Sequence, residues 1–196
     1  EILPVEGKNA EGLNDLVMQD EGIRFDASLD KLAGLNPVTE GGVITAGNAS
    51  QITDGAAAVV ICNDAGLKKI QKNPRAEIVS ISVVGDDPVF MLTGPIPASF
   101  KALETANLSI DDMDLYEVNE AFAPVPLAWA ADLKADRTKL NVNGGAMALG
   151  HPLGATGAKL MTTMLHELER REGKYALQAI CEGGGTANAT IIKRVI

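Results

Sequence analysis

One stretch of the sequence, residues 141–157, constrains the fold more than any other, because it places five glycines within 17 positions. Glycine reaches backbone conformations with positive φ and lets main-chain N–H groups come close to a ligand. After this stretch, apolar residues recur at helical spacing: Leu160, Met161, Met164, Leu165 and Leu168. The pattern predicts a glycine-rich loop that leads into a helix beginning near Gly154 or Ala155.

His151 lies inside this loop, between Gly150 and Pro152. A helix N-terminus favours anions and developing negative charge, and histidine changes its protonation most readily near neutral pH. We therefore expect His151 to belong to an active site. The alternative is a histidine that serves only the turn.

Composition narrows the class of protein. The 196-residue chain has a net charge of −9 and no Lys/Arg cluster beyond short pairs, so we expect no nucleic-acid partner. Its apolar runs are too short to cross a bilayer, no signal peptide is visible, and the two cysteines lack metal-ligand spacing. We expect a cytoplasmic protein with no membrane partner, no metal and no tightly bound cofactor.

Apolar and polar segments alternate in a way that predicts an α/β fold. Strands are expected at residues 56–62, 76–84, 175–181 and 187–195, and in a segment that ends at residue 118. Helices are expected at residues 65–72, 96–107, 121–134 and 155–171, with a helical turn capped by Ser28 in a loop-rich start. This order indicates a layered sheet of about five strands, with functional loops beyond the strand ends.

The two cysteines have different settings. Cys62 follows an apolar run and fits a buried structural cysteine. Cys181 ends an apolar run and precedes three glycines, which leave its thiol and the amides of Gly183 and Gly184 open to close approach. A thiol must ionise to act, and a nearby histidine can supply that. We therefore favour a functional role for Cys181 over a structural one.

Asn119 and Ser50 each have a structural alternative as well. Asn119 is expected at a strand-to-helix junction, where it is either a helix N-cap or an amide that holds a water or substrate oxygen. Ser50 lies in a polar loop and is either a turn residue or part of a site.

Seven short motifs lie along the chain: TAGNAS (45–50), DGAAA (54–58), GPIPA (94–98), NEAFA (119–123), NGGA (143–146), GHPLGATG (150–157) and CEGGG (181–185). Together these motifs closely resemble the C-terminal half of thiolases, which are acetyl-CoA acyltransferases of degradative and biosynthetic kinds. The motifs cover essentially the whole chain, in order and at family-like spacing. The resemblance implies a thiolase-like layered fold with a mixed sheet of roughly five strands covered by helices. Residues 1–40 would be the tail of a loop domain and residues 41–196 the C-terminal domain.

The resemblance also implies roles for four residues. Cys181 matches the acid/base cysteine, and His151 matches the histidine that activates the nucleophilic cysteine and lines an oxyanion hole. Asn119 matches the residue that positions the water of that hole, and the Gly183 amide matches a donor of a second hole. These roles suit the chemistry, because forming a carbanion beside a thioester needs a base and oxyanion donors. The shared imidazole is expected to lower thiol pKa values.

Substrate contacts follow from the same resemblance. Ser50, Met91, Phe122 and Arg24 align with positions that contact CoA or the acyl chain, so coenzyme A and acyl-CoA are the expected substrates. Many family members carry a Gln soon after NEAFA, whereas residues 124–126 here are Pro-Val-Pro. This departure is more similar to thiolases that act on bulky acyl chains, including steroid side chains.

One departure concerns the acyl-accepting cysteine, which in the family lies in the N-terminal half. Nothing in this chain replaces it, since Cys62 sits in an unlike context, so ping-pong acyl transfer needs another part of the protein. Position 1 is Glu and falls within loop-domain-like sequence. We expect a split, nicked or truncated thiolase completed by an N-terminal half, and a dimer or tetramer of the complete unit.

Two other functions are alternatives to thiolysis or the reverse Claisen condensation. A non-catalytic thiolase-like protein that binds acyl-CoA or lipid, or that serves interaction, would not need both His151 and Cys181. Decarboxylative condensation, as in ketoacyl synthases, uses one cysteine and two histidines. The second histidine here, His166, lies on a polar helix position, which disfavours that reaction.

Overall fold

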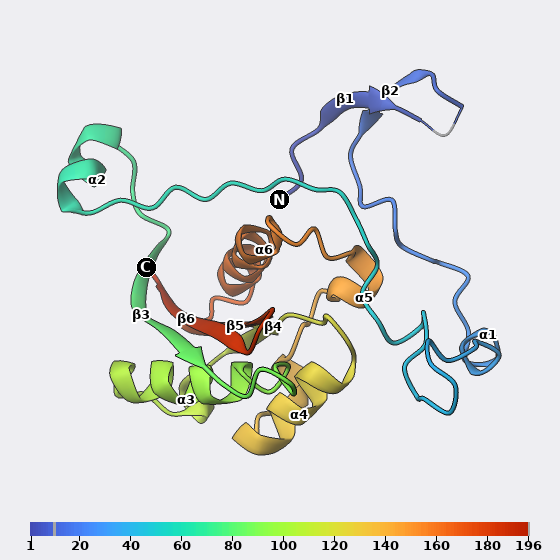
Figure 1. The fold of residues 1–196 in the computed structure, drawn as a ribbon. Helices are drawn as coiled ribbons and strands as arrows, with labels where there is room; N and C mark the ends of the chain where they lie inside the picture. Colours follow the sequence, from blue (N-terminus) through green and yellow to red (C-terminus); the bar gives the residue numbers. More distant parts are fainter. Residues whose placement is uncertain (10, 196) are drawn as a thin grey trace.

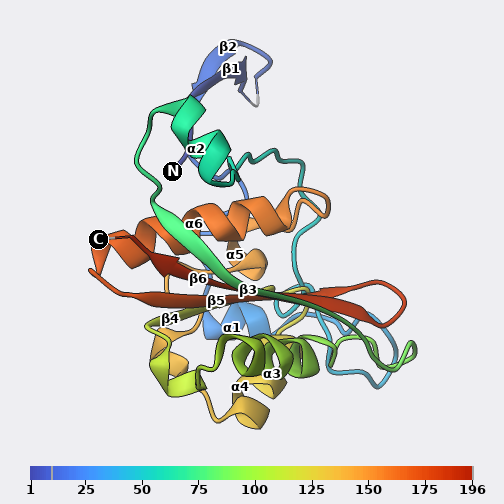
Figure 2. The same ribbon diagram turned by 90° about the vertical axis from the view of Figure 1, so that its left-hand side faces the viewer.

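The centre of the molecule is a mixed sheet with helices on both faces (Figures 1 and 2). The structure is a computed structural model and describes residues 1–9 and 11–195. The sheet has the order β3-β6-β5-β4, from β3 (Ala76–Gly85), β6 (Thr186–Arg194), β5 (Tyr175–Glu182) and β4 (Leu115–Val118). β4 runs parallel to β5 and the other neighbours are antiparallel. This agrees with the predicted α/β class and mixed sheet.

Helices cover the two faces unequally. α3 (Pro95–Ala106) and α4 (Pro124–Leu133) lie on one face, and α6 (Thr156–Arg170) and the single turn α5 (Ala146–Leu149) lie on the other (Figure 2). Both α3 and α4 begin with proline, whose missing N–H is tolerated in the first turn of a helix. The helix predicted from residue 121 therefore starts three positions later.

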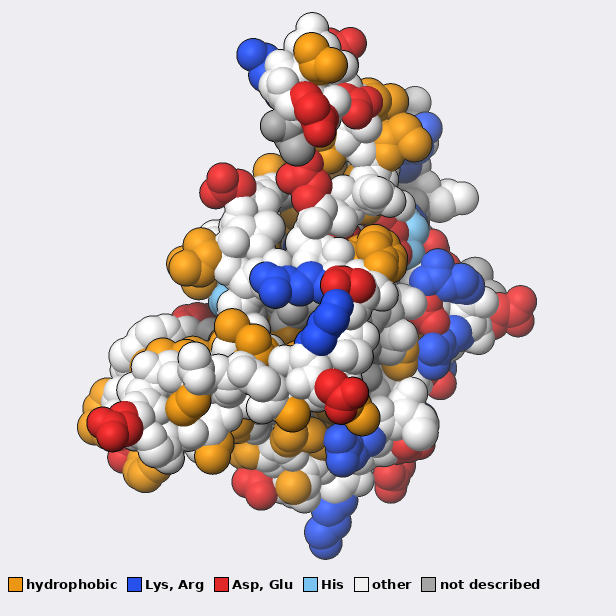
Figure 3. Space-filling view, turned by 90° about the vertical axis from the view of Figure 1, so that its right-hand side faces the viewer, with side chains coloured by type: hydrophobic (Ala, Val, Ile, Leu, Met, Phe, Trp, Pro, Cys, Tyr) orange, Lys and Arg blue, Asp and Glu red, His pale blue; other side chains and the backbone are white. Residues whose placement is uncertain are grey.

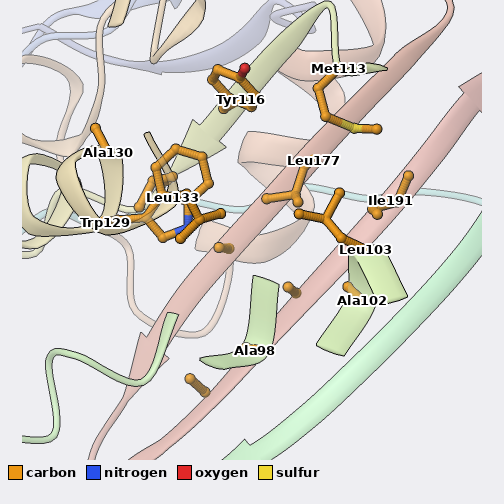
Figure 4. Packing of buried hydrophobic residues seen from close by; sticks show 14 of the residues in the cluster. Ala98, Ala102, Leu103, Met113, Tyr116, Trp129, Ala130, Leu133, Leu177 and Ile191 are labelled. Carbon is orange, nitrogen blue, oxygen red and sulfur yellow. The ribbon is translucent and has the colours of Figure 1, made fainter. Parts of the chain in front are cut away.

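The main core lies under α3 and α4. Trp129 fills its centre, with its ring centroid 5.3 Å from that of Tyr116 and its indole N–H donated to Ser99 Oγ at 2.8 Å (Figure 4). A second cluster, built on Leu115, Met164 and Leu168, packs α6 on the opposite face. Successive side chains of β4 point to opposite faces of the sheet, so they belong alternately to the two clusters.

The predicted strand at residues 56–62 is wrong. That segment runs through solvent as irregular backbone, with Val60 83% exposed and Ile61 71% exposed. Its apolar composition resembles that of a buried strand, but a strand also needs a hydrogen-bonded neighbour, and the described residues supply none. The sheet therefore has four strands rather than five. Cys62, expected to be buried, is exposed.

The N-terminal part lies around the sheet and adds nothing to its core. None of the described residues before Ser80 is buried. It contains the hairpin of β1 (Val5–Lys8) and β2 (Asn14–Val17), which was not predicted, and two short helices, α1 (Leu29–Ala33) and α2 (Asp64–Ile70). Ser28 caps α1 as predicted, and Asn63 caps α2. Two 3-10 turns, Ile110–Asp112 and Arg137–Lys139, complete the fold.

The predicted division of the chain near residue 40 is not tested by the fold and stays a prediction. Within the part that the structure describes, no helix has both the length and the apolar character needed to cross a bilayer.

Glu117 is a buried acid in the middle of β4. Its side chain is fully buried on the α6 face, and neither carboxyl oxygen has a hydrogen-bond partner among the described residues. It lies opposite Gln178 of β5, whose Oε1 is also unpartnered there. Burial, with a smaller contribution from Glu120, raises the pKa of Glu117 to about 8. The carboxyl is therefore neutral in the folded protein near pH 7, because ionisation without a partner is costly.

This acid makes stability depend on pH. From about pH 4.5 to 8, the unfolded chain loses the Glu117 proton while the folded chain keeps it, so the free energy of unfolding falls as pH rises. At about 1.4 kcal/mol per pKa unit, the loss over this shift is at most on the order of 5 kcal/mol. Glu117→Gln removes this dependence, and urea unfolding between pH 5 and 9 measures it. Glu104→Gln, at an exposed site on α3, is the matched control. An unchanged pH slope in Glu117→Gln would show that Glu117 is already ionised in the folded state.

Candidate active site

The loop that carries His151 is held in shape by glycine. Gly150 ends α5 with a φ of +88°, and a Cβ at this position would collide with the side chain of Thr53. Gly145, at the start of α5, lies so close to the Glu120 carboxylate that a Cβ would collide there too. These two glycines are therefore required by the close approach of two side chains of the protein itself. The predicted approach of a ligand to the main-chain N–H groups of this loop stays a prediction.

His151 bridges two elements through both ring nitrogens. Its Nε2 lies 3.3 Å from Asn119 Nδ2, at the end of β4, and its Nδ1 lies 2.6 Å from Thr156 Oγ1, the first residue of α6. Because the Asn119 amide nitrogen can only donate, Nε2 must accept and Nδ1 must carry the proton. Thr156 Oγ1 then accepts from Nδ1 and donates its own proton to Pro152 O at 3.2 Å. In this series of hydrogen bonds the Asn119 amide, the imidazole Nδ1–H and the Thr156 hydroxyl each have an acceptor.

The protonation of His151 follows from its surroundings. Burial lowers the pKa of the imidazole, and the positive charge of Lys159 lowers it further. The ring is therefore neutral at neutral pH, and its unprotonated nitrogen is the one on the Asn119 side. A neutral imidazole in this state can take a proton from a group that enters next to Asn119.

Asn119 connects this histidine to the central sheet. Its side chain is almost fully buried, and its backbone N–H donates to Ala179 O of β5 at 3.0 Å. Ala179 precedes Cys181 by two residues on the same strand. The Asn119 Oδ1 atom has no partner among the described residues, which leaves one buried acceptor free for a water or a ligand.

Cys181 lies near the end of β5 and is half-buried. Its side chain packs against the α3/α4 cluster, which Phe122 also contacts. Burial raises the pKa of the Cys181 thiol, and the negative charge of Glu182 raises it further. The lowering of this pKa that we expected from a nearby imidazole is therefore not seen. Desolvation by the apolar cluster is the larger effect, and the resting group is a thiol.

The turn after Cys181 is open at Gly183 and Gly184, as predicted, whereas Gly185 is packed against the backbone of residues 86–88. Gly184 and Gly185 have φ values of +78° and +82°, and a Cβ on Gly183 would meet nothing within 4 Å. Asp86 N donates to Gly185 O at 2.6 Å, which ties the turn to the loop between β3 and α3. That loop also carries Met91, whose φ of +29° is unusual for a residue with a side chain.

A pocket of about 670 Å³ brings two of the predicted residues together. It lies between residues 50–57 and 151–155, so Ser50 and His151 share it. The other predicted site residues do not line it. Arg24 is exposed and is not among the residues that line this pocket. Within residues 1–9 and 11–195, no three His, Cys, Asp or Glu side chains come together as metal ligands would.

Three residues that serve this region were missed in the sequence. Thr156 holds Nδ1 of His151, and its position five residues after the histidine, at a helix start, was the available signal. Glu120 accepts from Asn141 Nδ2 at 2.9 Å and from Met147 N at 3.1 Å, and so binds the glycine loop to the end of β4. Gln51 contacts the same loop, and no local pattern marks it.

Comparisons with known proteins agree on one family. Residues 72–194 match the family model described as thiolase, C-terminal domain, and residues 1–65 match thiolase, N-terminal domain. A steroid 3-ketoacyl-CoA thiolase of Mycobacterium tuberculosis is 61% identical over 176 residues, which are 90% of this chain and 43% of that protein.

Solved structures give the same result. Human mitochondrial 3-ketoacyl-CoA thiolase superposes with a TM-score of 0.93 at 46% identity, over 98% of this chain and 48% of that chain. The same human enzyme in complex with CoA superposes with a TM-score of 0.86 at 47% identity, over 92% of this chain and 46% of that chain. The chain thus spans about half the length of the relatives that it matches.

The hydrogen-bond chain at His151 predicts one tautomer. Nitrogen-15 NMR of the imidazole should show Nδ1 protonated and Nε2 unprotonated at neutral pH. Thr156→Val removes the acceptor for Nδ1–H, and a hydrogen bond worth about 0.5–1.5 kcal/mol shifts the tautomer ratio about 2- to 12-fold. Thr156→Ser keeps the hydroxyl and should keep the wild-type ratio. A wild-type ring protonated at Nε2 would contradict the assignment.

Proposed function

The chain belongs to the thiolase family, and from this premise we propose that it supplies the histidine and acid/base cysteine of a CoA-dependent acyltransferase site. The reaction is thiolytic cleavage of a 3-ketoacyl-CoA, or the reverse Claisen condensation. The observation that carries the proposal is the contact of His151 with Asn119, whose backbone is bonded to β5 two residues before Cys181. The segments that carry His151, Asn119 and Cys181 therefore meet at one end of the sheet.

In this proposal His151 acts first as a base. Its neutral Nε2 gives up the hydrogen bond from Asn119 Nδ2 and takes the proton of the nucleophilic thiol. The resulting imidazolium can then donate from Nε2 to the thioester oxygen as negative charge develops there. Asn119 stands next to that nitrogen and holds the water that is the second donor. Donors aimed at a developing oxyanion lower the barrier because the charge is largest in the transition state.

Cys181 acts on the α-carbon. In the cleavage direction it protonates the carbanion that leaves as acetyl-CoA, and in condensation it removes a proton from acetyl-CoA. The raised pKa of its thiol supports the first of these, since a protonated thiol is ready to donate. The Gly183 amide, in the open turn that follows, is the proposed donor to the enolate oxygen.

Substrate contacts are proposed for the remaining predicted residues. Ser50 shares the pocket with His151, and Phe122 shares the apolar cluster with Cys181, which supports CoA and acyl-chain contacts respectively. Met91 and Arg24 stay predictions from the family resemblance. Coenzyme A and acyl-CoA are substrates in this proposal, with no tightly bound cofactor. A bulky acyl chain, such as a steroid side chain, is the preferred class.

We further propose that an N-terminal thiolase half provides the acyl-accepting cysteine, either in the same polypeptide or as a separate chain. The relatives are about twice as long as this chain. The apolar segment 56–62 is exposed. Val5 and Leu16 of the β1–β2 hairpin are exposed as well, and apolar side chains show on the surface at the top of Figure 3, where this hairpin lies. Burying such surface against another domain is favourable. A homo-oligomer of the complete unit and a cytoplasmic location stay predictions, since the human relative is mitochondrial by name.

Substitutions at the site test the activity. In the native, complete protein, Asn119→Ala and His151→Ala should each lower kcat for thiolysis about 100- to 1000-fold, the usual effect of losing one oxyanion donor. Cys181→Ser should lower it at least as much, because a serine hydroxyl is a poor acid/base at this position. Glu104→Gln, at an exposed site on α3, is the control and should keep wild-type activity. Turnover by Cys181→Ser close to wild type would refute the assignment.

Mass spectrometry of the active native protein tests whether an N-terminal thiolase half accompanies this chain. The expected result is a species in which this 20.5 kDa chain is accompanied by N-terminal thiolase sequence, in one polypeptide or two. Val60→Asp, in the exposed apolar segment, should weaken that association or destabilise the complete unit. A lone 20.5 kDa species with full thiolase activity would refute this part of the proposal.

A further inference from the structure

A short segment joins the two loops that carry Asn119 and His151. We call residues 48–53 the strap. On one side, Ala123 N donates to Asn48 O at 2.9 Å and Ser50 N donates to Ala121 O at 3.0 Å. On the other side, His151 N donates to Gln51 O at 3.1 Å. The strap is therefore hydrogen-bonded to both loops at once.

Gln51 makes most of the contacts to the histidine loop. Its side-chain Nε2 donates to Met147 O at 3.2 Å and to Ala148 O at 3.3 Å, both in α5, and to Gly22 O at 2.9 Å. The last carbonyls of a helix have no partner within the helix, and α5 has only four residues. The Gln51 amide thus supplies donors that this turn cannot supply itself.

The two contacts of Gln51 lie on opposite sides of Gly150. The side-chain amide of Gln51 donates to carbonyls of α5 just before Gly150. The backbone carbonyl of Gln51 accepts from the His151 N–H just after Gly150. Thr53 closes the third side, since its side chain fills the space next to Gly150 and its hydroxyl donates to Gln51 O at 3.2 Å. The left-handed bend at Gly150 is therefore clamped by the strap on both flanks.

We propose that Gln51 is a positioning residue that holds the imidazole of His151 at Asn119. The contact it protects is long, at 3.3 Å between Nε2 and Nδ2, so a small movement of the loop breaks it. Thr156 fixes the rotation of the ring but not the path of the backbone that carries it. The expected effect of Gln51 on turnover rests on the thiolase activity proposed above. Its expected effect on the position and pKa of His151 does not.

The loss of the Gln51 amide has a measurable signature at the histidine. A looser loop admits water to the ring, which weakens the desolvation that lowers the pKa of His151. Lys159 on α6 is the charged neighbour that acts on the same pKa, and it is unchanged by a substitution at Gln51. The pKa of His151 should therefore rise toward its ordinary value when the strap is released.

The test compares two variants with a matched control in the native, complete protein. Gln51→Glu has nearly the same shape but cannot donate from its carboxylate, and Gln51→Ala removes the group without adding charge. Gln19→Ala changes a glutamine at an exposed position of the N-terminal segment and is the control. The readouts are NMR titration of His151, identified by the loss of its signals in His151→Asn, and kcat and KM for CoA.

Both Gln51 variants should raise the pKa of His151 and lower kcat about 10- to 100-fold, with a smaller change in KM, as expected for a misplaced catalytic group. The control should match wild type in each measurement. If both variants melt at lower temperature but titrate and turn over like wild type, Gln51 serves stability alone and the inference is overturned. If wild type shows no thiolysis while the titration still shifts, the positioning role stands and the proposed function fails.

Discussion

The site depends on one chain of hydrogen bonds, from Asn119 through both nitrogens of His151 to Thr156. This chain joins the end of β4 to the start of α6, which cover different parts of the fold. It fixes the ring, its tautomer and the direction of its basic nitrogen. Because the pKa of the ring is lowered by burial, the same packing that holds the imidazole keeps it neutral. Geometry and protonation therefore have one cause.

Much of this arrangement was predictable because it is local. The helix after the glycine loop, the capped turn at Ser28 and the two C-terminal strands follow from spacing and turn residues, and the structure confirms them. The fifth strand failed because an apolar run such as 56–62 shows what must be buried but not what buries it. Thr156 and Gln51 were missed because their partners are decided by tertiary contacts.

Two buried acids in or next to β4 show how the sheet supports the site. Glu117 has no hydrogen-bond partner among the residues that the structure describes and is kept neutral by burial, whereas Glu120 accepts hydrogen bonds from the glycine loop. The two acids lie three positions apart in the sequence. Among the described residues, only the oxygens of Glu120 reach hydrogen-bond donors. A buried carboxylate persists when donors surround it, and otherwise it holds its proton. The motif from Asn119 to Phe122 thus combines a group of the site with its own support.

The central claim is that His151 and Cys181 serve a nucleophile that lies outside residues 1–196. The most direct measurement is peptide mass spectrometry of the complete protein after brief exposure to a 3-ketoacyl-CoA or to acetyl-CoA followed by acid quenching. The account predicts an acyl group on a cysteine of the N-terminal half, with Cys181 and Cys62 unmodified. An acyl thioester on Cys181 would contradict it, because that sulfur would then be the nucleophile rather than the acid/base.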